Sequence, residues 1–427
     1  VYLQREYRRY YPAAEVSAHV VGMTNIDDVG LEGLELAYEE WLSGEPGAKR
    51  VVKDGQHHII EDVESISRPR PGKDLRLSID RRIQYLAYRE LKAAVQEHKA
   101  GSGTAVVLDV RSGQVLAMVN QPSFNPNSRK KIQRSSMRNR AVTDVFEPGS
   151  TMKPFIVATA LESGRYRPDT PVSTSPGWFR VGVNTVRDVH DYGDLDVSGV
   201  IRKSSNVGVT KIALSLSVED IWADLAEVGF GEQTYSGFPG EASGLLSHHS
   251  GWNAIETATL AYGYGISVTA LQLAQAYAVL AADGIRRPVA FLQDTEVTEE
   301  RRVMPQQVAR EVRAMLAQAA GPEGTAPAAQ IAGYTVAGKT GTVHKSVAGG
   351  YSDNRYLSLF AGMAPANDPR LVMVVMIDEP DNGKHYGGLV AAPVFSKVIS
   401  GALRLLAVPP DDLPLLQTQQ VTTGDAA

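Results

Sequence analysis

Glu147-Pro148-Gly149-Ser150-Thr151-Met152-Lys153-Pro154-Phe155 is the stretch around which the rest of the chain is organised. The proline and glycine before Ser150 predict a tight turn leading into a helix. The second proline falls in the first turn, where a missing N–H costs nothing. Residues three apart share one helix face, so the Ser150 hydroxyl and the Lys153 amine can meet. The positive end of the helix and a neighbouring amine are what a nucleophilic serine requires.

The same Ser-x-x-Lys pattern occurs a second time, at Ser128-Arg129-Lys130-Lys131. Composition alone predicts roughly one or two such matches in a chain of this length. The second copy lies in a polar stretch with no apolar period behind it, so we interpret it as a solvated loop. The assignment of Ser150 as nucleophile therefore depends on partners elsewhere in the chain.

The composition sets broad limits on the class of protein. The chain has 427 residues, 43% hydrophobic and 21% charged, with a net charge of -5 and a pI of about 6.0. These values are typical of a globular protein of two or three domains and give no indication of nucleic-acid binding. The absence of cysteine excludes disulfides and thiolate metal sites. No apolar run reaches membrane-spanning length. Because the chain begins with Val1, we expect a fragment whose signal or anchor lies upstream.

Residues 1–72 are predicted to form a small separate module. It contains a helix at 36–42, a loosely alternating hairpin at 51–64, and a proline-stiffened linker at 68–72. A larger domain spans 73–408. The remaining tail, 409–427, has little to bury, so we expect it to be mobile.

The larger domain is predicted to have an α+β fold, with helices packed against a central antiparallel sheet. Polar residues 122–140 show no regular period and are predicted to form a loop. The expected helices and strands are helices at 79–98 and 269–283, strands at 104–108 and 114–119 joined by a hairpin turn at 111–113, and a meander of strands at 334–343, 356–363 and 371–377. The helix at 269–283 begins with a capping box formed by Thr269 and Gln272.

A second motif, Ser204-Ser205-Asn206, begins 54 residues after Ser150 at the start of an apolar helical stretch. The Ser204 hydroxyl can relay a proton from Lys153 towards a leaving amine, and the Asn206 amide can hold Lys153 and a substrate carbonyl. The motif is weak alone, because Ser-x-Asn also occurs at 123–125 and 352–354.

The third motif is Lys339-Thr340-Gly341-Thr342, the only Lys-Thr-Gly in the chain. It lies on a predicted strand, and the missing side chain of Gly341 would let a substrate lie along the strand edge. Lys339 and the hydroxyls of Thr340 and Thr342 would bind a carboxylate. A surface turn is the alternative reading of this motif alone. Three motifs in this order are much harder to obtain by chance.

In this order the motifs resemble those of penicillin-binding proteins and serine β-lactamases. The flanking strings resemble class B penicillin-binding proteins, most closely the division-specific penicillin-binding protein 3 group. One departure is His385, which precedes Tyr386 where a second aromatic residue is expected. The strings that carry the resemblance are 30–35, 138–141, 147–155, 203–208, 263–282, 377–380, 386–388 and 391–395.

The resemblance implies a D,D-transpeptidase of septal peptidoglycan, with a transpeptidase domain preceded by a pedestal or dimerisation-like module. Ser150 would attack a D-Ala-D-Ala terminus, with Lys153 as a neutral base and Ser204 as proton shuttle. Burial and the charge of Lys339 would both lower the pKa of Lys153. The N–H groups of Ser150 and Thr342 would form the oxyanion hole. Asn206 completes the set of residues expected to take part in catalysis.

Further residues expected to line the cleft are Val189, Tyr264, Tyr356 and Tyr386, although Tyr264 could equally be ordinary core. The resemblance implies peptidoglycan stem peptides as substrates and β-lactams as inhibitors. The implied protein partners are membrane proteins of the division complex, including a septal glycan polymerase. The resemblance also implies a periplasmic location, with anchoring to the inner membrane by an N-terminal helix absent from this chain. It implies no cofactor, no metal and no nucleic-acid partner.

Three alternatives stay open. A β-lactamase shares the motifs but needs a dedicated deacylation base, which we cannot place between motifs two and three. A D,D-carboxypeptidase would use water as the acceptor. A division scaffold would use residues 1–72 to recruit partners, a role compatible with catalysis.

Overall fold

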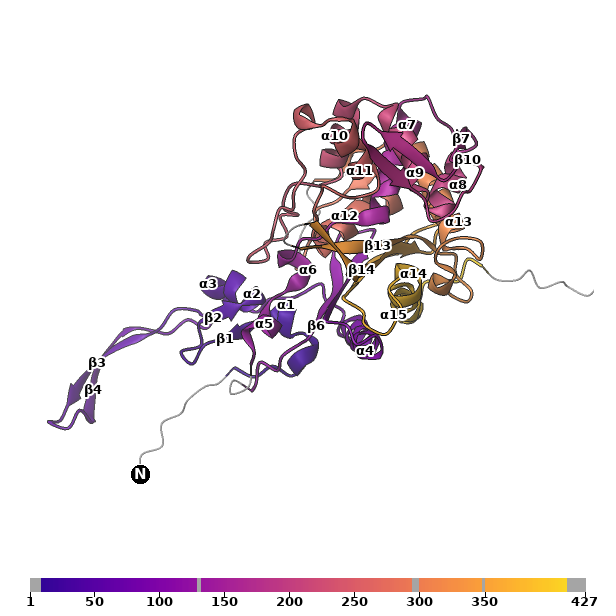
Figure 1. The fold of residues 1–427 in the computed structure, drawn as a ribbon. Helices are drawn as coiled ribbons and strands as arrows, with labels where there is room; N and C mark the ends of the chain where they lie inside the picture. The colour runs from indigo at the N-terminus through magenta and orange to yellow at the C-terminus, as the bar shows by residue number, and fades with distance from the viewer. Residues whose placement is uncertain (1–8, 129–131, 294–298, 348–349, 413–427) are drawn as a thin grey trace, which may run out of the picture.

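The computed structural model describes residues 9–128, 132–293, 299–347 and 350–412 (Figure 1). The second Ser-x-x-Lys pattern ends at residues 129–131, which lie outside the described residues, as do residues 413–427 of the predicted tail. The first residues of that tail contact the larger domain. The Asp411 carboxylate accepts hydrogen bonds from the Thr335 N–H at 2.8 Å and from Asn367 Nδ2 at 2.8 Å.

A five-stranded antiparallel sheet forms the centre of the molecule. Its strand order is β13-β14-β15-β5-β6, so β13 lies at an edge. The predicted meander is confirmed, with longer strands than the sequence suggested. The strands are β5 (Ser102–Asp109), β6 (Val115–Gln121), β13 (Ala337–Val347), β14 (Gly350–Ala364) and β15 (Leu371–Asp378).

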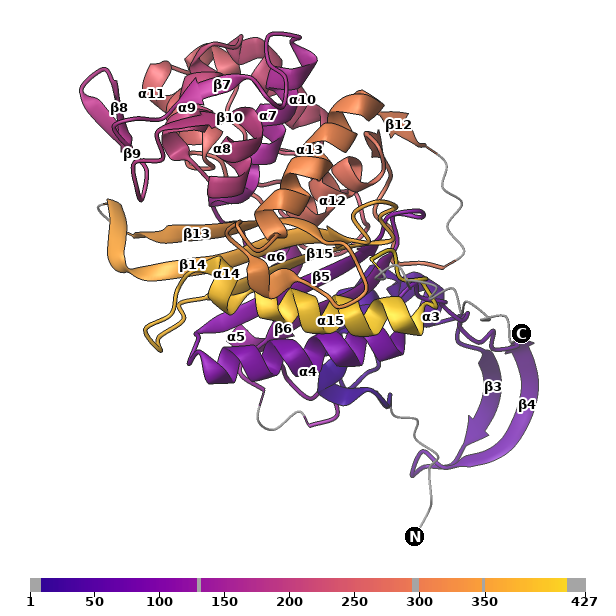
Figure 2. The ribbon, with the colours of Figure 1, turned by 90° about the vertical axis from the view of Figure 1, so that its right-hand side faces the viewer.

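Two helices cover one face of the sheet, α4 (Arg81–Glu97) and α15 (Ala392–Leu405) (Figure 2). The Asp80 carboxylate caps α4 at the N–H of Arg82 and Ile83. Leu91 of α4 and Phe395 of α15 are completely buried against the sheet. Burial of such a side chain stabilises the fold by about 1.5–3 kcal/mol. The helix predicted at 79–98 is confirmed, whereas α15 was not predicted.

The opposite face of the sheet packs on a helical lobe. Its central helix, α12 (Ala270–Ala281), is buried on all sides, and the predicted capping box of Thr269 and Gln272 is present. The other helices are α6 (Arg140–Thr143), α7 (Lys153–Glu162), α8 (Val197–Lys203), α9 (Asn206–Leu214), α10 (Val218–Glu227), α11 (Ala254–Ala261) and α13 (Gln306–Ala320).

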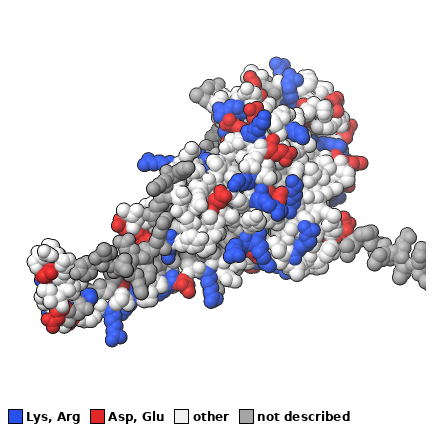
Figure 3. All heavy atoms as spheres, turned by 90° about the horizontal axis from the view of Figure 1, so that it is seen from below, with Lys and Arg blue, Asp and Glu red and all other residues white. Residues whose placement is uncertain are grey.

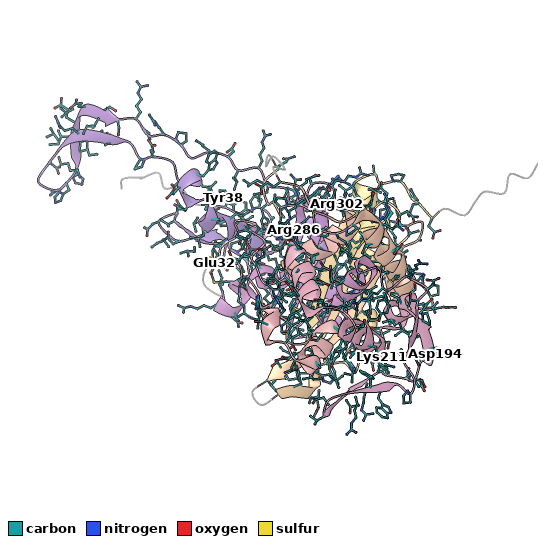
Figure 4. The ribbon with its side chains drawn as sticks, turned by 90° about the horizontal axis from the view of Figure 1, so that it is seen from above. Glu32, Tyr38, Asp194, Lys211, Arg286 and Arg302 are labelled. Carbon is teal, nitrogen blue, oxygen red and sulfur yellow. The ribbon has the colours of Figure 1, made fainter. Side chains whose placement is uncertain are left out.

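Three short antiparallel strand pairs of the described chain belong to this lobe. Lys211 of α9 donates a hydrogen bond to the Ser173 carbonyl at 2.6 Å, and its side chain lies near Asp194 (Figure 4). This bond ties the middle of the lobe to its rim. The pairs are β7 (Pro171–Ser173) with β10 (Asp194–Asp196), β8 (Trp178–Val181) with β9 (Asn184–Arg187), and β11 (Ile285–Arg286) with β12 (Arg301–Arg302). The short 3-10 helices η3 (Gly149–Met152) and η4 (His249–Gly251) complete this lobe. The further short helices η5 (Pro327–Ala329) and α14 (Gly387–Val390) pack beside α15 instead.

The N-terminal part lies to one side of the sheet, and a two-stranded ribbon projects from it (Figures 1 and 2). The ribbon confirms the predicted hairpin. The predicted helix at 36–42 is interrupted at Tyr38, and the predicted linker is tied back by backbone hydrogen bonds between Arg70 and Glu45. The elements are η1 (Ala14–Val16), α1 (Ala18–Val21), β1 (Met23–Thr24), β2 (Gly30–Glu32), α2 (Gly33–Ala37), α3 (Glu39–Leu42), β3 (Ala48–Lys53) and β4 (Ile59–Ser67).

The loop predicted at 122–140 contains a short helix, α5 (Arg134–Met137), so the expectation of no regular structure was wrong there. The Ser136 side chain donates to the Gln133 carbonyl, and the Ser136 carbonyl contacts buried His19 Nε2 at 2.8 Å. Tertiary contacts thus order a polar stretch.

Across the described ranges, no helix combines the length and apolarity needed to cross a membrane. Both basic and acidic side chains occupy the face seen from below (Figure 3).

Candidate active site

Ser150 lies in a 3-10 turn, η3, which runs directly into α7. It therefore precedes the first α-helical turn in which the sequence placed it. Gly149 has a φ of 55°, and a Cβ there would come within 2.4 Å of Val343 Cγ2. Its N–H donates to the Gly263 carbonyl at 3.1 Å. A glycine is therefore needed for the turn that carries Ser150 to pack against edge strand β13.

Lys153 is completely buried and is brought against the second motif. Its Nζ donates to the Ser204 carbonyl at 2.5 Å, to Ser204 Oγ at 3.1 Å and to Asn206 Oδ1 at 2.7 Å. All three acceptors are neutral oxygens. The predicted meeting of Lys153 with Ser204 and Asn206 is therefore present.

Ser204 occupies the junction between α8 and α9 with a left-handed backbone, φ 62° and ψ 37°. This conformation is uncommon for residues other than glycine and is found at strained functional positions. Lys339 Nζ donates to Ser204 Oγ at 2.9 Å. The Ser204 oxygen thus accepts from two amines, and its own proton remains available to a third partner.

The two lysines have unusual protonation behaviour. Burial lowers the pKa of Lys153 well below its usual value, and the charge of Lys339 lowers it further, while Asp188 opposes the shift. Burial lowers the pKa of Lys339, also completely buried, to about 7. Neutral oxygens stabilise an ammonium far less than a carboxylate would. The site can therefore hold an amine base in its neutral form near neutral pH.

The third motif lies on β13, at the edge of the sheet, beside the turn that carries Ser150. The Thr342 Oγ1 accepts the Gly387 N–H at 3.0 Å, which leaves its hydroxyl proton free. Thr340 Oγ1 lies 2.9 Å from Thr325 Oγ1. A Cβ on Gly341 would come within 3.1 Å of the Pro148 carbonyl and of Leu359 Cβ. The glycine therefore allows close packing of β13 on the catalytic turn, a role not predicted from the sequence.

The predicted cleft aromatics fall into two places. Tyr264 lines a groove of about 490 Å3 together with Asn206, His344 and Tyr351. Tyr264 also packs against the core, as the alternative reading of this residue predicted. The groove therefore begins at the second motif and extends along the lobe.

Tyr356 and Tyr386 lie elsewhere, in one cluster around His385. The Tyr356 ring stacks on His385 with centroids 4.1 Å apart, and the centroids of the His385 and Tyr386 rings are 4.5 Å apart. His385, the departure noted in the sequence, thus connects the two predicted tyrosines. Val189 is 73% exposed and directly follows Asp188. It does not line the 490 Å3 groove.

Sequence reasoning missed two carboxylates that support the site. Asp188 accepts hydrogen bonds at the start of α9, including one from Ser205 Oγ at 2.5 Å. Glu147 Oε1 accepts from the Gly265 N–H and from the Tyr351 hydroxyl, each at 2.9 Å. Glu147 adjoins the first motif, which was the available signal for it. Asp188 belongs to no motif, and nothing in its local sequence indicated its position. The described part of the chain contains no cluster of three His, Asp or Glu side chains able to hold a metal.

Comparisons with known proteins place this geometry in a family. Residues 103–400 match the family described as the penicillin binding protein transpeptidase domain, and residues 1–77 match the penicillin-binding protein dimerisation domain. The chain is 44% identical over 425 residues to the peptidoglycan D,D-transpeptidase FtsI of Escherichia coli K12, covering all of this chain and 70% of that protein. It is 44% identical over 409 residues to the probable peptidoglycan D,D-transpeptidase PbpC of Pseudomonas aeruginosa, covering 96% and 72%.

Solved structures agree with the sequence comparisons. The apo transpeptidase domain of penicillin-binding protein 3 from Burkholderia pseudomallei matches with a TM-score of 0.73 and 44% identity, over 80% of this chain and 100% of that one. The residues that match the transpeptidase family, 103–400, contain all three motifs. With its edge strand, its buried lysine pair and these relatives, the chain belongs to the penicillin-binding protein transpeptidase family, in its class B branch.

Proposed function

We propose that this protein is a peptidoglycan D,D-transpeptidase that cross-links stem peptides through an acyl-enzyme on Ser150. The observation that carries the proposal is the Lys153 amine, completely buried and hydrogen-bonded to Ser204 and Asn206. A neutral amine in this position can take the Ser150 proton. The names and similarity of the relatives support the same reaction.

Acylation follows from the arrangement of the three motifs. Lys153 takes the proton from Ser150 Oγ, which attacks the carbonyl of the penultimate D-Ala. The N–H groups of Ser150 and Thr342 stabilise the negative charge on the carbonyl oxygen. The C–N bond to the terminal D-Ala breaks, and the proton passes by way of Ser204 Oγ to the leaving amine. Lys339 holds Ser204 from the opposite side at 2.9 Å.

The second half of the reaction reverses these proton transfers. The amine of a neighbouring stem peptide attacks the acyl carbonyl, loses its proton to the site, and Ser150 leaves with a proton restored to its Oγ. A β-lactam acylates Ser150 in the same way, but its leaving amine stays attached to the acyl group and blocks the acceptor. Lys339, Thr340 and Thr342 bind the carboxylate common to both ligands. Gly341 lets their strand pack on the Ser150 turn.

We further propose that Tyr264 lines the donor cleft, that Tyr356 and Tyr386 form its opposite wall with His385, and that Val189 borders its mouth. The protein acts at the septum on the periplasmic side of the inner membrane, held by a membrane anchor, with a glycan polymerase and other division proteins as partners. Residues 1–72 form the pedestal, 73–408 the transpeptidase domain and 409–427 the tail.

The test is intact mass measurement after incubation with a penicillin, with the modified residue mapped. One β-lactam should add per chain at Ser150 and persist for many minutes. Ser150→Ala should abolish labelling while leaving the thermal transition nearly unchanged. Labelling that survives in Ser150→Ala contradicts the assignment. Fast turnover of nitrocefin would instead favour a β-lactamase, release of D-Ala without an acceptor a carboxypeptidase, and no labelling of the native chain a scaffold.

A further inference from the structure

The segment that follows β9 makes an unusual set of contacts with the second motif. Asp188 Oδ1 accepts the N–H of Asn206 at 2.5 Å and that of Val207 at 3.0 Å, and Asp188 Oδ2 accepts from Ser205 Oγ at 2.5 Å. Ser205 Oγ accepts the next N–H, that of Gly208, at 2.8 Å. The free N–H groups at the start of α9 are thus satisfied by a carboxylate from another part of the chain.

The same segment also holds the Asn206 side chain. Asn206 Nδ2 donates to the Arg187 carbonyl at 3.1 Å, which orients its Oδ1 towards Lys153 Nζ at 2.7 Å. The segment is itself fixed, because the Asp188 N–H donates to the Gly177 carbonyl at 2.9 Å. A continuous set of hydrogen bonds therefore runs from the β8–β9 ribbon through Asp188 and Asn206 to the lysine.

We propose that Asp188 is a positioning residue for acyl transfer: its carboxylate fixes the Ser204–Asn206 segment and, through it, Lys153. The inference rests on the proposed function. Ser204 has a left-handed backbone immediately before the residues that Asp188 binds. Such a conformation persists only where its surroundings hold it. Without Asp188, the N–H groups of Asn206 and Val207 lose their acceptor at the point where the chain turns.

Asp188 also contributes a negative charge that acts on Lys153. It favours the protonated form of Lys153, against burial and against the charge of Lys339, which both lower the pKa of Lys153. Burial raises the pKa of Tyr192, and Asp188 raises it further. The other charged or titratable groups on its own segment are Arg187, His190 and Asp191. Removing the charge while keeping the shape should therefore let Lys153 lose its proton at lower pH.

Two variants of Asp188 separate the effect of position from that of charge, and a third variant, at Asp191, is a matched control. Asp188→Ala removes every acceptor oxygen. Asp188→Asn keeps one oxygen for the two N–H groups but removes the charge. Asp191→Asn removes the same charge three residues away, where the carboxylate accepts from the Gly193 N–H and Ser175 Oγ instead of from the second motif.

The measurement is the second-order rate of penicillin acylation of the whole chain as a function of pH, with thermal unfolding as the check on folding. Asp188→Ala should lose roughly ten- to a hundredfold in rate, as expected when a reacting group is displaced by about 1 Å. Asp188→Asn should lose less, and the acid side of its rate profile should move to lower pH. Asp191→Asn should match the native protein in both respects.

The outcomes separate the inference from the function it rests on. If the native chain is not acylated at Ser150, both are overturned. If it is acylated and Asp188→Ala keeps the native rate, only the inference is overturned. If Asp188→Ala does not fold, Asp188→Asn decides. A native rate and pH profile in that variant, or an equal shift in Asp191→Asn, overturns the role of Asp188.

Discussion

Two clusters of basic side chains in this molecule have opposite surroundings. The first, a group of arginines, lines a hollow of about 610 Å3 at the C-terminal end of α12. Asp283 sits among its arginines, 2.8 Å from Arg310 and 2.9 Å from Arg313. Arg302, marked in Figure 4, donates to the Asp283 carbonyl at 2.6 Å. The arginines lining it are Arg111, Arg287, Arg302, Arg310 and Arg313.

At the catalytic site, the lysines Lys153 and Lys339 meet at Ser204 Oγ with neutral oxygens as hydrogen-bond partners. The consequence is visible in the protonation states. Burial lowers both lysine pKa values. Burial opposes ionisation of Asp283, yet hydrogen bonds from Arg310, Gln306 and Arg313 outweigh it and hold the pKa of that carboxyl far below its usual range. A paired charge stabilises a helix end, whereas an unpaired buried amine is free to exchange a proton.

The largest expected effect contrasts a base with a structural cation. Lys153→Met should reduce the acylation rate by roughly a hundred- to ten-thousandfold, the usual contribution of a general base. The matched change, Arg310→Met in the arginine hollow, should leave that rate unchanged. Both rates can be followed by penicillin labelling of the purified chain. Equal losses in the two variants would show that the comparison is drawn wrongly.

The second effect is on stability and has a definite sign with pH. The fall in the pKa of Lys339 from 10.5 to about 7 corresponds to at most about 5 kcal/mol. Between these pH values the unfolded chain carries a proton that the folded chain lacks, so the native protein gains stability as pH rises. Lys339→Met removes the cost of burying the charge. The variant should therefore be more stable than the native protein at pH 7 or below. This difference in stability should become smaller as the pH rises to 10.

Thermal or denaturant unfolding at several pH values measures this difference, and acylation should fall in the same variant. Such a gain in stability with a loss of activity is typical of active sites that retain a destabilising group for function. A gap between the two proteins that grows as pH rises from 7 to 10 would contradict the direction given for Lys339.

A feature of the fold or of the site could be predicted from the sequence only where a few neighbouring residues indicate it. The capping box at Thr269 and the five strands of the central sheet follow from short-range patterns, and these were found. The three motifs were found because each carries its chemistry in a few adjacent residues. Asp188 lies 17 residues before Ser205, in a segment with no pattern of its own, so only the folded chain brings the two together.

Other failures have equally physical reasons. The left-handed backbone of Ser204 is set by the junction of two helices, since serine has no local preference for it. The packing role of Gly341 was not predicted because the direction of its missing side chain depends on strand register, which faces it towards Pro148. Helix α5 forms in a polar stretch because tertiary contacts with His19 order it.

A smaller effect tests how the third motif reads its ligand. Thr342→Val keeps the shape and the backbone N–H but removes the hydroxyl, whose oxygen accepts from Gly387. A hydrogen bond to a charged group is worth about 1.5–3 kcal/mol, so penicillin acylation should slow roughly ten- to a hundredfold. The loss should shrink for a ligand whose carboxylate is esterified. Measured acylation rates for acid and ester forms on both proteins give the coupling, and equal losses would exclude Thr342 from carboxylate binding.

The smallest effect comes from the exposed half of the arginine hollow. Arg310 is 53% exposed, and its guanidinium shares Asp283 Oδ2 with Gln306. Exposed ion pairs contribute little and are screened by salt, so Arg310→Met should lower the thermal midpoint by no more than about two degrees, and by less in high salt. Arg313 remains on the other oxygen of Asp283 at 2.9 Å, so the end of α12 stays closed. If Arg310→Met keeps its thermal midpoint but loses acylation, the arginine hollow takes part in catalysis. The distinction between paired and unpaired charge would then not predict function.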